Sequence, residues 1–500
     1  MALADYFRKS AVAASQVVAG FDETAIRERL DQCDVGVMIG NDAQRNPEGL
    51  AATDMLVRLL GRFYPRISFQ SSADITRWVE LARSINPEIE IHEDTPQIGV
   101  AVGIDAPRAA ALTISIGSDG WDATVSTTEP MKVGDSLNPF GAGIAACLGA
   151  ANLFRVVMLG SKDTLDQSLV FSGFHLEPGP TSKDVACDVV LNKGCVLVGL
   201  GAIGNGAAWA LGRCPGKGTI HLVDPQHVEL SNLQRYVLTD RSSDGEHKLD
   251  VATAYFSGSL VPESHKYDWA KFVEDNGYSW DRVLVALDSA KDRRAVQSSL
   301  PRWIANAWTQ PGDLGVSVHP SFYENGACLS CLYLPKDRLP SEDRIIARAL
   351  GLGEEHELSI RQLLYDNAPA PPEMLKLAAS NLHVPEDDLL LFSNRTLREL
   401  YSEGICGGAV LPLDRVGMPT HDVHVPLAHQ SALAGIGLAS RLVADGLGHG
   451  PTHSEATRIN LMGSFTQFPT QPIGKDPRGI CVCQDETYID AYRTKYQFLK

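Results

Sequence analysis

Short apolar runs alternate along this chain with patterns typical of helices. Two of them, 97–104 and 111–117, are dense in Val and Ile, and 195–198 leads directly into a glycine-rich turn. A helical pattern over 205–213 follows, and then another apolar run, 219–224. Runs of this length without polar alternation are typical of parallel strands that are buried on both faces. The pattern therefore predicts an α/β fold built on a Rossmann-like, doubly wound sheet.

The first part of the chain repeats this order in weaker form. A strand-like run over 35–40 precedes a helical pattern over 51–63, but no glycine fingerprint lies between them. We infer a second, degenerate copy of the same fold. After Pro335 the charges rise and helical patterns follow one another. The expected domains are a degenerate unit over 1–185, an active unit over 186–335, a helical insertion over 336–405, and a segment over 406–500 that completes the active unit.

The turn after the 195–198 run has the spacing of a nucleotide-binding loop. Gly199, Gly201 and Gly204 form GxGxxG between a strand and a helix, and Asp224 ends the next strand. Glycines let the turn close and let a ligand approach the backbone, while the start of the helix offers unpaired N–H groups to phosphate. The acid can hydrogen-bond a ribose hydroxyl. This motif predicts a nucleotide site without distinguishing NAD from ATP.

Three charged residues further along distinguish these nucleotides. Arg235 and Lys248 follow the second strand, and Asp288 ends a third apolar run, 283–288. The carboxyl ends of strands in a doubly wound sheet face the ligand crevice, so we expect these side chains there together with Asp224. A dehydrogenase has little need of two further cations and a second acid. A triphosphate with magnesium needs cations for its phosphates and an acid for the metal.

With these residues the chain resembles the ubiquitin-activating enzymes and the ThiF- and MoeB-type enzymes that adenylate sulfur-carrier proteins. The matching segments, in matching spacing, are GLGAIG at 199–204, SNLQR at 231–235 and LDSAKDR at 287–293, together with Asp224 and Lys248. Three positions depart from the family's usual residues: Ala202 stands for a glycine, Tyr236 for a glutamine and Ser289 for an asparagine. The four charged positions match the residues of the family.

The resemblance implies an adenylation fold, in which ATP binds over the glycine turn with Asp224 on its ribose. Asn232, Arg235 and Lys248 would also bind the nucleotide, and Asp288 would hold magnesium. The family further implies a pseudodimer whose inactive unit lends an arginine to the phosphates. Arg8, on an expected N-terminal helix, is the best-placed candidate. The alternative is a solvated arginine, the common fate of a surface charge.

Two cysteine pairs have the spacing of a metal knuckle. Cys328 and Cys331 form CxxC in a turn-like setting, and Cys481 and Cys483 form CxC near the end of the chain. Four thiolates suit tetrahedral zinc and leave no open position for water, so such a site would be structural. Members of the family carry a similar zinc, usually from two CxxC pairs. The alternative is two pairs of free or disulfide-bonded thiols.

Cys406 stands between glycines at the end of the helical insertion. These neighbours would expose its thiol, and a nucleophilic cysteine needs exposure and a lowered pKa. In members of the family that go beyond adenylation, a cysteine in such a crossover region attacks the acyl-adenylate and holds the carrier as a thioester. The resemblance gives this role to Cys406, with a buried structural thiol as the alternative.

Composition excludes some classes of protein. The 61 acids against 44 bases give a net charge of −17, which argues against nonspecific nucleic-acid binding but allows a basic protein partner. The first residues lack a signal-peptide pattern, and we expect the apolar stretch 141–160 to be a closely packed buried helix rather than a membrane segment. Ten cysteines then indicate a reducing compartment. We expect a cytoplasmic protein.

The expected function is ATP-dependent adenylation of the C-terminus of a ubiquitin-like protein, thioester formation on Cys406, and transfer to a conjugating enzyme. By analogy, the chain would serve a prokaryotic ubiquitin-like conjugation system, some of which accompany antiviral defence genes. One alternative keeps adenylation, of a sulfur-carrier protein or a small acid, without the thioester. Two others are an NAD-dependent oxidoreductase and an inactive scaffold that binds a ubiquitin-like protein. The sequence leaves the oligomeric state open.

Overall fold

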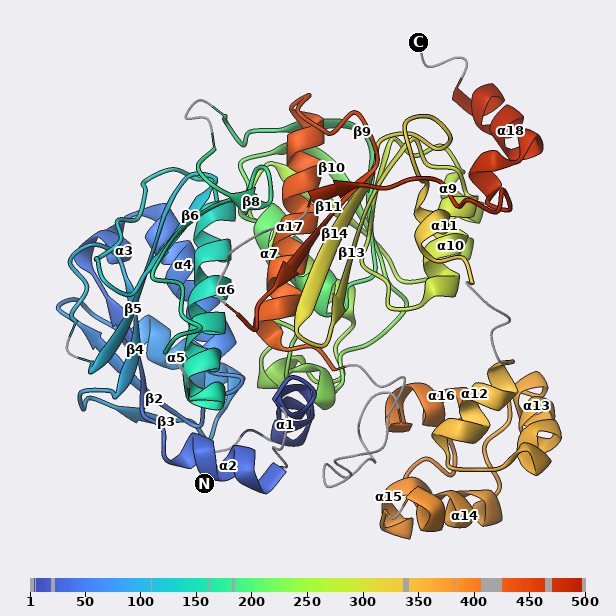
Figure 1. Ribbon diagram of the computed structural model, residues 1–500, viewed down its shortest axis with the longest axis horizontal. Helices are drawn as coiled ribbons and strands as arrows, with labels where there is room; N and C mark the ends of the chain where they lie inside the picture. Colours follow the sequence, from blue (N-terminus) through green and yellow to red (C-terminus); the bar gives the residue numbers. More distant parts are fainter. Residues whose placement is uncertain are drawn as a thin grey trace. The chain divides into compact units, whose positions relative to one another are not determined.

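The computed structural model describes residues 4, 6–18, 23–108, 110–160, 162–181, 185–335, 341–382, 384–405, 425–463 and 470–496. The chain forms two compact units. Unit 1 combines residues 1–7, 29–334 and 426–500, and unit 2 combines 8–28 with 335–425. Unit 1 contains both β-sheets, and the described part of unit 2 is helical (Figure 1).

The first sheet of unit 1 has eight strands in the order β3-β2-β1-β4-β5-β6-β7-β8. Their bounds are β1 Val35–Ile39, β2 Arg66–Ser71, β3 Glu90–His92, β4 Ile98–Val102, β5 Leu112–Asp119, β6 Asp122–Ser126, β7 Ser168–Ser172 and β8 Glu177–Pro178. The first five strands in sequence pair in parallel, and the last three are antiparallel.

The second sheet repeats this topology strand for strand. Its order is β11-β10-β9-β12-β13-β14-β15-β16, with the same change from parallel to antiparallel pairing after the fifth strand. The bounds are β9 Val190–Val198, β10 Lys217–Val223, β11 Leu260–His265, β12 Arg282–Val285, β13 Trp303–Gln310, β14 Asp313–His319, β15 Glu455–Asn460 and β16 Thr470–Pro472. The expected pair of doubly wound units is confirmed.

Corresponding helices of the two halves pack against one another between the sheets (Figure 1). They are α4 (Pro47–Leu60) and α6 (Phe140–Phe154) of the first half, and α7 (Ala202–Leu211) and α17 (Ala428–Gly446) of the second. Small residues allow close contact, since a Cβ at Gly143 of α6 would lie 2.5 Å from a ring carbon of Trp209 in α7. The site described below is built on α4 and α7.

The remaining helices of unit 1 lie in the connections and at the end of the chain. They are α3 (Asn41–Arg45), α5 (Thr76–Ile85), α8 (Lys248–Thr253), α9 (Trp269–Asn276), α10 (Ala290–Ser298), α11 (Leu329–Leu332) and α18 (Glu486–Tyr496). Phe140–Leu159, which is α6 with the π-helical turn after it, is the one helix in the described residues that is long and apolar enough to cross a membrane. Because 94% of its most apolar window is buried inside the protein, it fits the expected core helix.

Unit 2 has an apolar core of its own, formed by the helical insertion between β14 and α17. Its helices there are α12 (Glu342–Ala349), α13 (Glu357–Tyr365), α14 (Pro372–Leu382), α15 (Glu386–Leu390) and α16 (Leu397–Glu399). The N-terminal helix α1 (Phe7–Ser15) and most of α2 (Glu23–Asp31) cluster with this unit. Residues 406–424 lie outside the described part of the chain.

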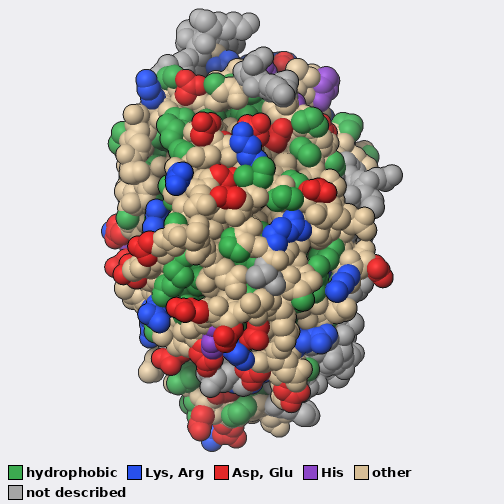
Figure 2. Space-filling model, turned by 90° about the vertical axis from the view of Figure 1, so that its left-hand side faces the viewer, with side chains coloured by type: hydrophobic (Ala, Val, Ile, Leu, Met, Phe, Trp, Pro, Cys, Tyr) green, Lys and Arg blue, Asp and Glu red, His purple; other side chains and the backbone are tan. Residues whose placement is uncertain are grey.

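One face of the molecule is covered by charges of both signs. Figure 2 shows the left-hand side of Figure 1, where Lys and Arg side chains are interspersed with Asp and Glu. Nucleic-acid binding needs a continuous basic surface, and this face does not offer one.

Candidate functional site

The glycine turn joins the carboxyl end of β9 to the start of α7. Gly199 has a φ of +90°, in the left-handed region, and a Cβ there would lie 2.7 Å from the Ala286 carbonyl oxygen. A Cβ at Gly204 would overlap the Gly199 carbonyl oxygen. Gly201 is the N-cap of α7. Two of the glycines are therefore required by packing alone, and the turn brings the start of α7 close to the end of β9.

Asp224 connects this turn to the end of β10. Its carboxylate is buried, and one oxygen accepts a hydrogen bond from the Leu200 N–H at 2.6 Å. The other oxygen accepts from the Gln226 N–H at 2.8 Å. A carboxylate offers about four acceptor positions, so both oxygens keep capacity for a ribose hydroxyl.

Lys248 and Arg235 both lie against the ring of Tyr236. The Lys248 Nζ is 5.2 Å from the ring centroid and donates to Gln226 Oε1 at 2.7 Å, while the Arg235 guanidinium is 5.6 Å from the same centroid. Burial would lower the pKa of Lys248, but Tyr236 and Asp224 outweigh it and hold that pKa above its ordinary value. The structure thus brings Asp224 and both cations together beside the glycine turn.

Tyr236, one of the departures from the family pattern, is part of this cluster. A Cβ at Gly201 would lie 3.5 Å from the Tyr236 hydroxyl oxygen, so the tyrosine reaches the N-terminus of α7. The side chain is 5% exposed. Sequence reasoning counted Tyr236 only as a departure, although an aromatic ring between two cations is a recognisable cation–π arrangement.

The side chains of Asp288 and Asn232 differ in exposure and in their hydrogen bonds. Asp288 is exposed in the loop between β12 and α10, next to the glycine turn, because the Ala286 N–H donates to the Val198 carbonyl. Asn232 instead uses its carboxamide in its own turn, where Oδ1 accepts from the Glu229 N–H at 3.1 Å. Asp288 is available for a ligand, whereas the Asn232 side chain has a local structural role.

Arg293, in the motif that contains Asp288, supports that loop. Its Nε donates to the Leu287 carbonyl at 2.7 Å, and its guanidinium lies over the ring of Tyr333, 4.8 Å from the centroid. The side chain is 5% exposed. Arg293 therefore fixes the backbone before Asp288.

Two arginines of the first half hold the loop that follows Arg235, and sequence reasoning missed both. Arg58 of α4 donates to the Val237 carbonyl at 3.0 Å. Arg62 donates to the Tyr236 carbonyl at 2.7 Å and also to the Thr239 carbonyl. Burial lowers the pKa of Arg62 to about 10, so it stays charged at neutral pH. Since the carbonyls are more than 170 residues away along the chain, no local sequence signal pointed to them.

A buried carboxylate beside these arginines connects α4 to α7. Asp54 accepts from Arg58 Nε at 3.0 Å, from Trp209 Nε1 at 2.8 Å and from Arg213 Nη2 at 2.8 Å. Burial would raise the pKa of Asp54, but Arg58 and Arg213 outweigh it and lower that pKa to about 2. The helix that starts at the glycine turn is thereby anchored to the first half.

In the first sheet, the position of the glycine turn is taken by two carboxylates of the chain itself. After β1, Asp105 accepts from the Asn41 N–H at 2.7 Å and from its Nδ2 at 2.7 Å. Asp42 accepts from the Ala43 and Ile104 N–H groups at 2.9 and 3.0 Å. These N–H groups are the donors that a phosphate would use. A polyphosphate would find them occupied and would meet two negative charges, which fits an inactive unit.

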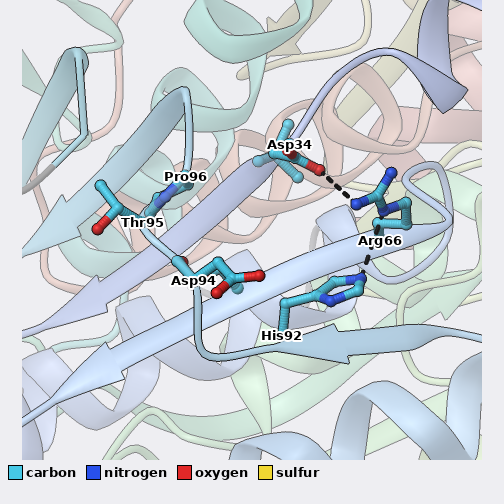
Figure 3. Close-up of a pocket in the computed structure, with 8 residues that line it drawn as sticks. Asp34, Arg66, His92, Asp94, Thr95 and Pro96 are labelled. Carbon is cyan, nitrogen blue, oxygen red and sulfur yellow. Dashed lines mark hydrogen bonds and ion pairs between the residues drawn. The ribbon is translucent and has the colours of Figure 1, made fainter.

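The cavity in Figure 3 lies at the amino ends of β1 and β2. Asp34, Arg66 and His92 are among its lining residues, with Arg66 paired to Asp34 at 3.0 Å. Its volume is about 20 Å³, close to the space of one water molecule. Ligands of doubly wound sheets bind at the carboxyl ends of strands, so this cavity is no nucleotide site.

The four cysteines expected to bind zinc come together from two distant segments. Cys328 Sγ lies 3.5 Å from Cys481 Sγ, and Cys331 Sγ lies 3.5 Å from Cys483 Sγ. All four sulfurs lie within 4.8 Å of one another, and none is in a disulfide. Hydrogen bonds from Cys328, Cys481 and Cys483 lower the pKa of Cys331. The cluster fits tetrahedral metal coordination despite the CxC spacing, and the disulfide alternative does not hold for these thiols.

The other described cysteines are Cys33, Cys147, Cys187, Cys195 and Cys214, and all are buried. Burial is the main cause that raises the pKa of Cys33 and Cys195, to about 11 and about 12. Cys406, the expected nucleophile, lies outside the described residues. Arg8, expected to reach the nucleotide, lies in α1 of unit 2, and that contact stays a prediction.

Two family models match the chain. The ThiF family matches residues 179–352, which contain the glycine turn, Asp224, Arg235, Lys248 and Asp288. Prokaryotic E2 family C matches residues 39–159, inside the half that was expected to be a degenerate adenylation unit. Sequence reasoning did not anticipate this second match.

Full-length and structural relatives also exist. The uncharacterized protein y4jF of Sinorhizobium fredii is 41% identical over 510 residues, which cover 99% of this chain and 98% of the relative. A crystal structure of E. coli MccB with AMPCPP and selenomethionine MccA has 14% identity and a TM-score of 0.35, over 57% of this chain and 65% of MccB. A second, of E. coli MccB with succinimide, has 15% identity and a TM-score of 0.32, over 58% of this chain and 66% of MccB. The chain thus spans slightly less than two thirds of MccB.

The fold, the candidate nucleotide site and the full-length relative support the same family assignment. Both halves have the doubly wound topology, the second half carries the nucleotide turn with its charged cluster, and y4jF matches across both. The chain belongs to the ThiF family of adenylating proteins, in a form whose N-terminal half matches Prokaryotic E2 family C.

Proposed function

We propose that the protein uses ATP to adenylate the C-terminal carboxylate of a ubiquitin-like protein, and that the carrier then passes through a thioester on Cys406 to a conjugating enzyme. The observation that carries the adenylation step is the cluster of Asp224, Arg235 and Lys248 around Tyr236 and Gln226, beside the glycine turn. An NAD-dependent oxidoreductase would leave both cations without a role.

In the adenylation step, the carboxylate of the carrier attacks the α-phosphorus of ATP, and the bond to the pyrophosphate oxygen breaks. The N-terminus of α7 and the glycine turn would cradle the phosphates, while Asp224 would hold the ribose. Arg235 and Lys248 would offset the charge that develops on the phosphates, which is the main electrostatic contribution to such reactions. Asp288 would hold magnesium, which would neutralise the departing pyrophosphate.

In the second step, the thiolate of Cys406 attacks the acyl carbon, the bond to the phosphate oxygen breaks and AMP leaves. The other nine cysteines support this assignment, because four of them form the metal cluster and five are buried. Cys147 is the only cysteine in the segment that matches Prokaryotic E2 family C, and it is fully buried in α6. We therefore assign the acceptor thiol after Cys406 to a separate conjugating enzyme.

The four-cysteine cluster would hold a structural zinc. Four thiolates fill the coordination sphere, so the ion would fasten the segment after β14 to the end of the chain and would not activate water. None of the nine described cysteines is in a disulfide, which suits a reducing compartment and supports the expected cytoplasmic location. The link to antiviral defence rests on family analogy alone and stays a prediction.

The adenylation step is tested by ATP–pyrophosphate exchange with purified ubiquitin-like proteins that end in glycine. Exchange should depend on the carrier and should be lost in Lys248→Met. Exchange without any covalent adduct would favour the alternative of sulfur-carrier adenylation. Redox turnover of NADH together with silent exchange would overturn the proposal.

The thioester step is tested by the chemistry of the adduct at residue 406. The wild type should form a carrier adduct that thiols cleave, Cys406→Ala should form none, and Cys406→Ser should form an ester that resists thiols. Both variants should keep the exchange activity of the wild type, because Cys406 acts after adenylation. A thiol-sensitive adduct that persists in Cys406→Ala would refute the assignment.

A further inference from the structure

Three polar side chains converge on the edge of the second sheet and form a group separate from the four cysteines. His221 on β10 is in register with Glu263 on β11, and His265 follows two residues later, so all three point to the same face. His221 Nδ1 lies 2.9 Å from His265 Nε2 and 3.4 Å from Glu263 Oε2. These donor atoms all lie within 4.8 Å of one another.

The two rings are held in this orientation by their surroundings. The His265 Nδ1 lies 3.3 Å from the Tyr267 hydroxyl oxygen, so that its Nε2 faces His221. The Trp280 ring packs edge-on against His221 at a centroid distance of 5.0 Å, and Phe272 packs against His265 at 4.8 Å. A hydrogen bond to the far nitrogen of a ligating imidazole is the usual support for a metal-bound histidine.

We propose that His221, His265 and Glu263 form a second metal site, which binds Zn²⁺ with two imidazoles and one carboxylate. Zinc accepts nitrogen and oxygen ligands in this combination, and three protein ligands leave a fourth position open to water. Two nitrogens on one tetrahedral zinc lie about 3.3 Å apart, so the 2.9 Å gap needs to open by only a few tenths of an ångström.

Charge and exposure also suit a cation at this position. Burial lowers the pKa of both imidazoles, which favours the neutral ring that a metal requires. The Glu263 side chain is 54% exposed and supplies the negative charge, while His221 is 17% exposed. The site is therefore accessible from solvent on one side and enclosed by aromatic rings on the other.

The site is connected to the nucleotide crevice through one backbone hydrogen bond. The Asp224 N–H donates to the His265 carbonyl at 3.3 Å, where β10 and β11 end side by side. A metal that binds both strands would fix the end of β10 and thus the residue expected to hold the ribose. This consequence rests on the proposed nucleotide site, whereas metal binding itself does not.

The test counts zinc per chain in the full-length protein. After dialysis against a weak chelator, zinc binding is measured by titration calorimetry and elemental analysis in the wild type, His221→Ala and Glu263→Gln. His356→Ala, which removes a histidine of unit 2, is the matched control. The wild type and the control should bind one equivalent more than His221→Ala. Loss of a supporting partner alone weakens metal binding about 10–100-fold, so Glu263→Gln should weaken it by at least about tenfold.

A spectroscopic readout separates this site from the cysteine cluster. Cobalt in place of zinc should give the sulfur charge-transfer bands of the cluster in every variant, and a second set of weaker bands that is missing in His221→Ala. Equal zinc stoichiometry in the wild type and His221→Ala would overturn the proposal. Unchanged zinc affinity in Glu263→Gln would also overturn the proposal. This variant keeps the shape of an exposed side chain, so it tests the site even if His221→Ala does not fold.

Discussion

Replacing Asp54 by asparagine should weaken the connection between α4 and the helix that starts at the glycine turn. A protonated aspartic acid and an asparagine have the same charge and nearly the same shape. The free energy of unfolding that the protein loses when Asp54 is protonated therefore predicts the loss caused by Asp54→Asn. Its pKa falls from an ordinary 3.8 to about 2 because of Arg58 and Arg213, despite the opposing effect of burial.

At 1.36 kcal/mol for each pKa unit, this difference corresponds to about 2.5 kcal/mol at pH 7. Because the pKa is lowered in the folded state, the stabilisation is present above about pH 4 and is lost as the pH falls towards 2. At pH 3 about half of it remains. Breaking a buried ion pair by removing one partner typically costs about 3–5 kcal/mol, slightly more than this figure.

The assay is urea denaturation at pH 7 and pH 3, followed by circular dichroism. Asp54→Asn should be about 2.5 kcal/mol less stable than the wild type at pH 7, and the gap should shrink by about half at pH 3. Asp490→Asn is the matched control, since its pair with Arg493 is exposed and contributes under about 1 kcal/mol. A gap below about 1 kcal/mol at pH 7, or one that does not depend on pH, would refute the reasoning.

Four further predictions concern the nucleotide turn, the charged cluster, the arginine support and the metal cluster. Gly204→Ala should abolish binding of a fluorescent ATP analogue, because its Cβ would overlap a backbone oxygen, whereas Gly474→Ala, with open space around it, should bind normally. Lys248→Met should raise the Kd of the analogue by about 10–100-fold, the equivalent of one charged hydrogen bond. Arg62→Met should raise this Kd by about tenfold without changing the far-ultraviolet circular dichroism spectrum. An unchanged Kd would show that the loop after Arg235 keeps its conformation without Arg62. Cys331→Ser should lower the melting temperature and make it insensitive to chelators, as expected of a structural zinc site.

The central part of the second sheet could be predicted from sequence because its signal is local. The run into Gly199, the helix after it and the acid at the end of β10 are consecutive in the chain, so the motif fixes their order and their meeting point. Lys248 follows the second strand of this motif, as expected, and begins α8. The position of the charged residues could also be predicted, because they follow parallel strands, and parallel strands bring their carboxyl ends to one edge of the sheet.

Other features left no pattern that sequence reasoning could use. Only one of the six residues of β11 is buried, and the strand lacks an apolar run, so the strand that carries Glu263 and His265 was not expected. The contacts of Arg58 and Arg62 are made to backbone carbonyls, which every residue has, and therefore leave no trace in residue types. The strands β2 and β3 were missed for the same reason as β11, because neither RISFQS nor EIH is a continuous apolar run.

The contacts give the first half a structural role in the candidate nucleotide site of the second half. In the first sheet, Asp42 and Asp105 occupy the N–H groups that a phosphate would need. Helix α4 of the first half meanwhile supplies Arg58 to the loop after Arg235 and Asp54 to α7. The two halves thus have complementary roles, because the second half presents the charged groups and the first half fixes the backbone that carries them. A second half expressed alone would keep every motif residue and lose the positions that make them a site.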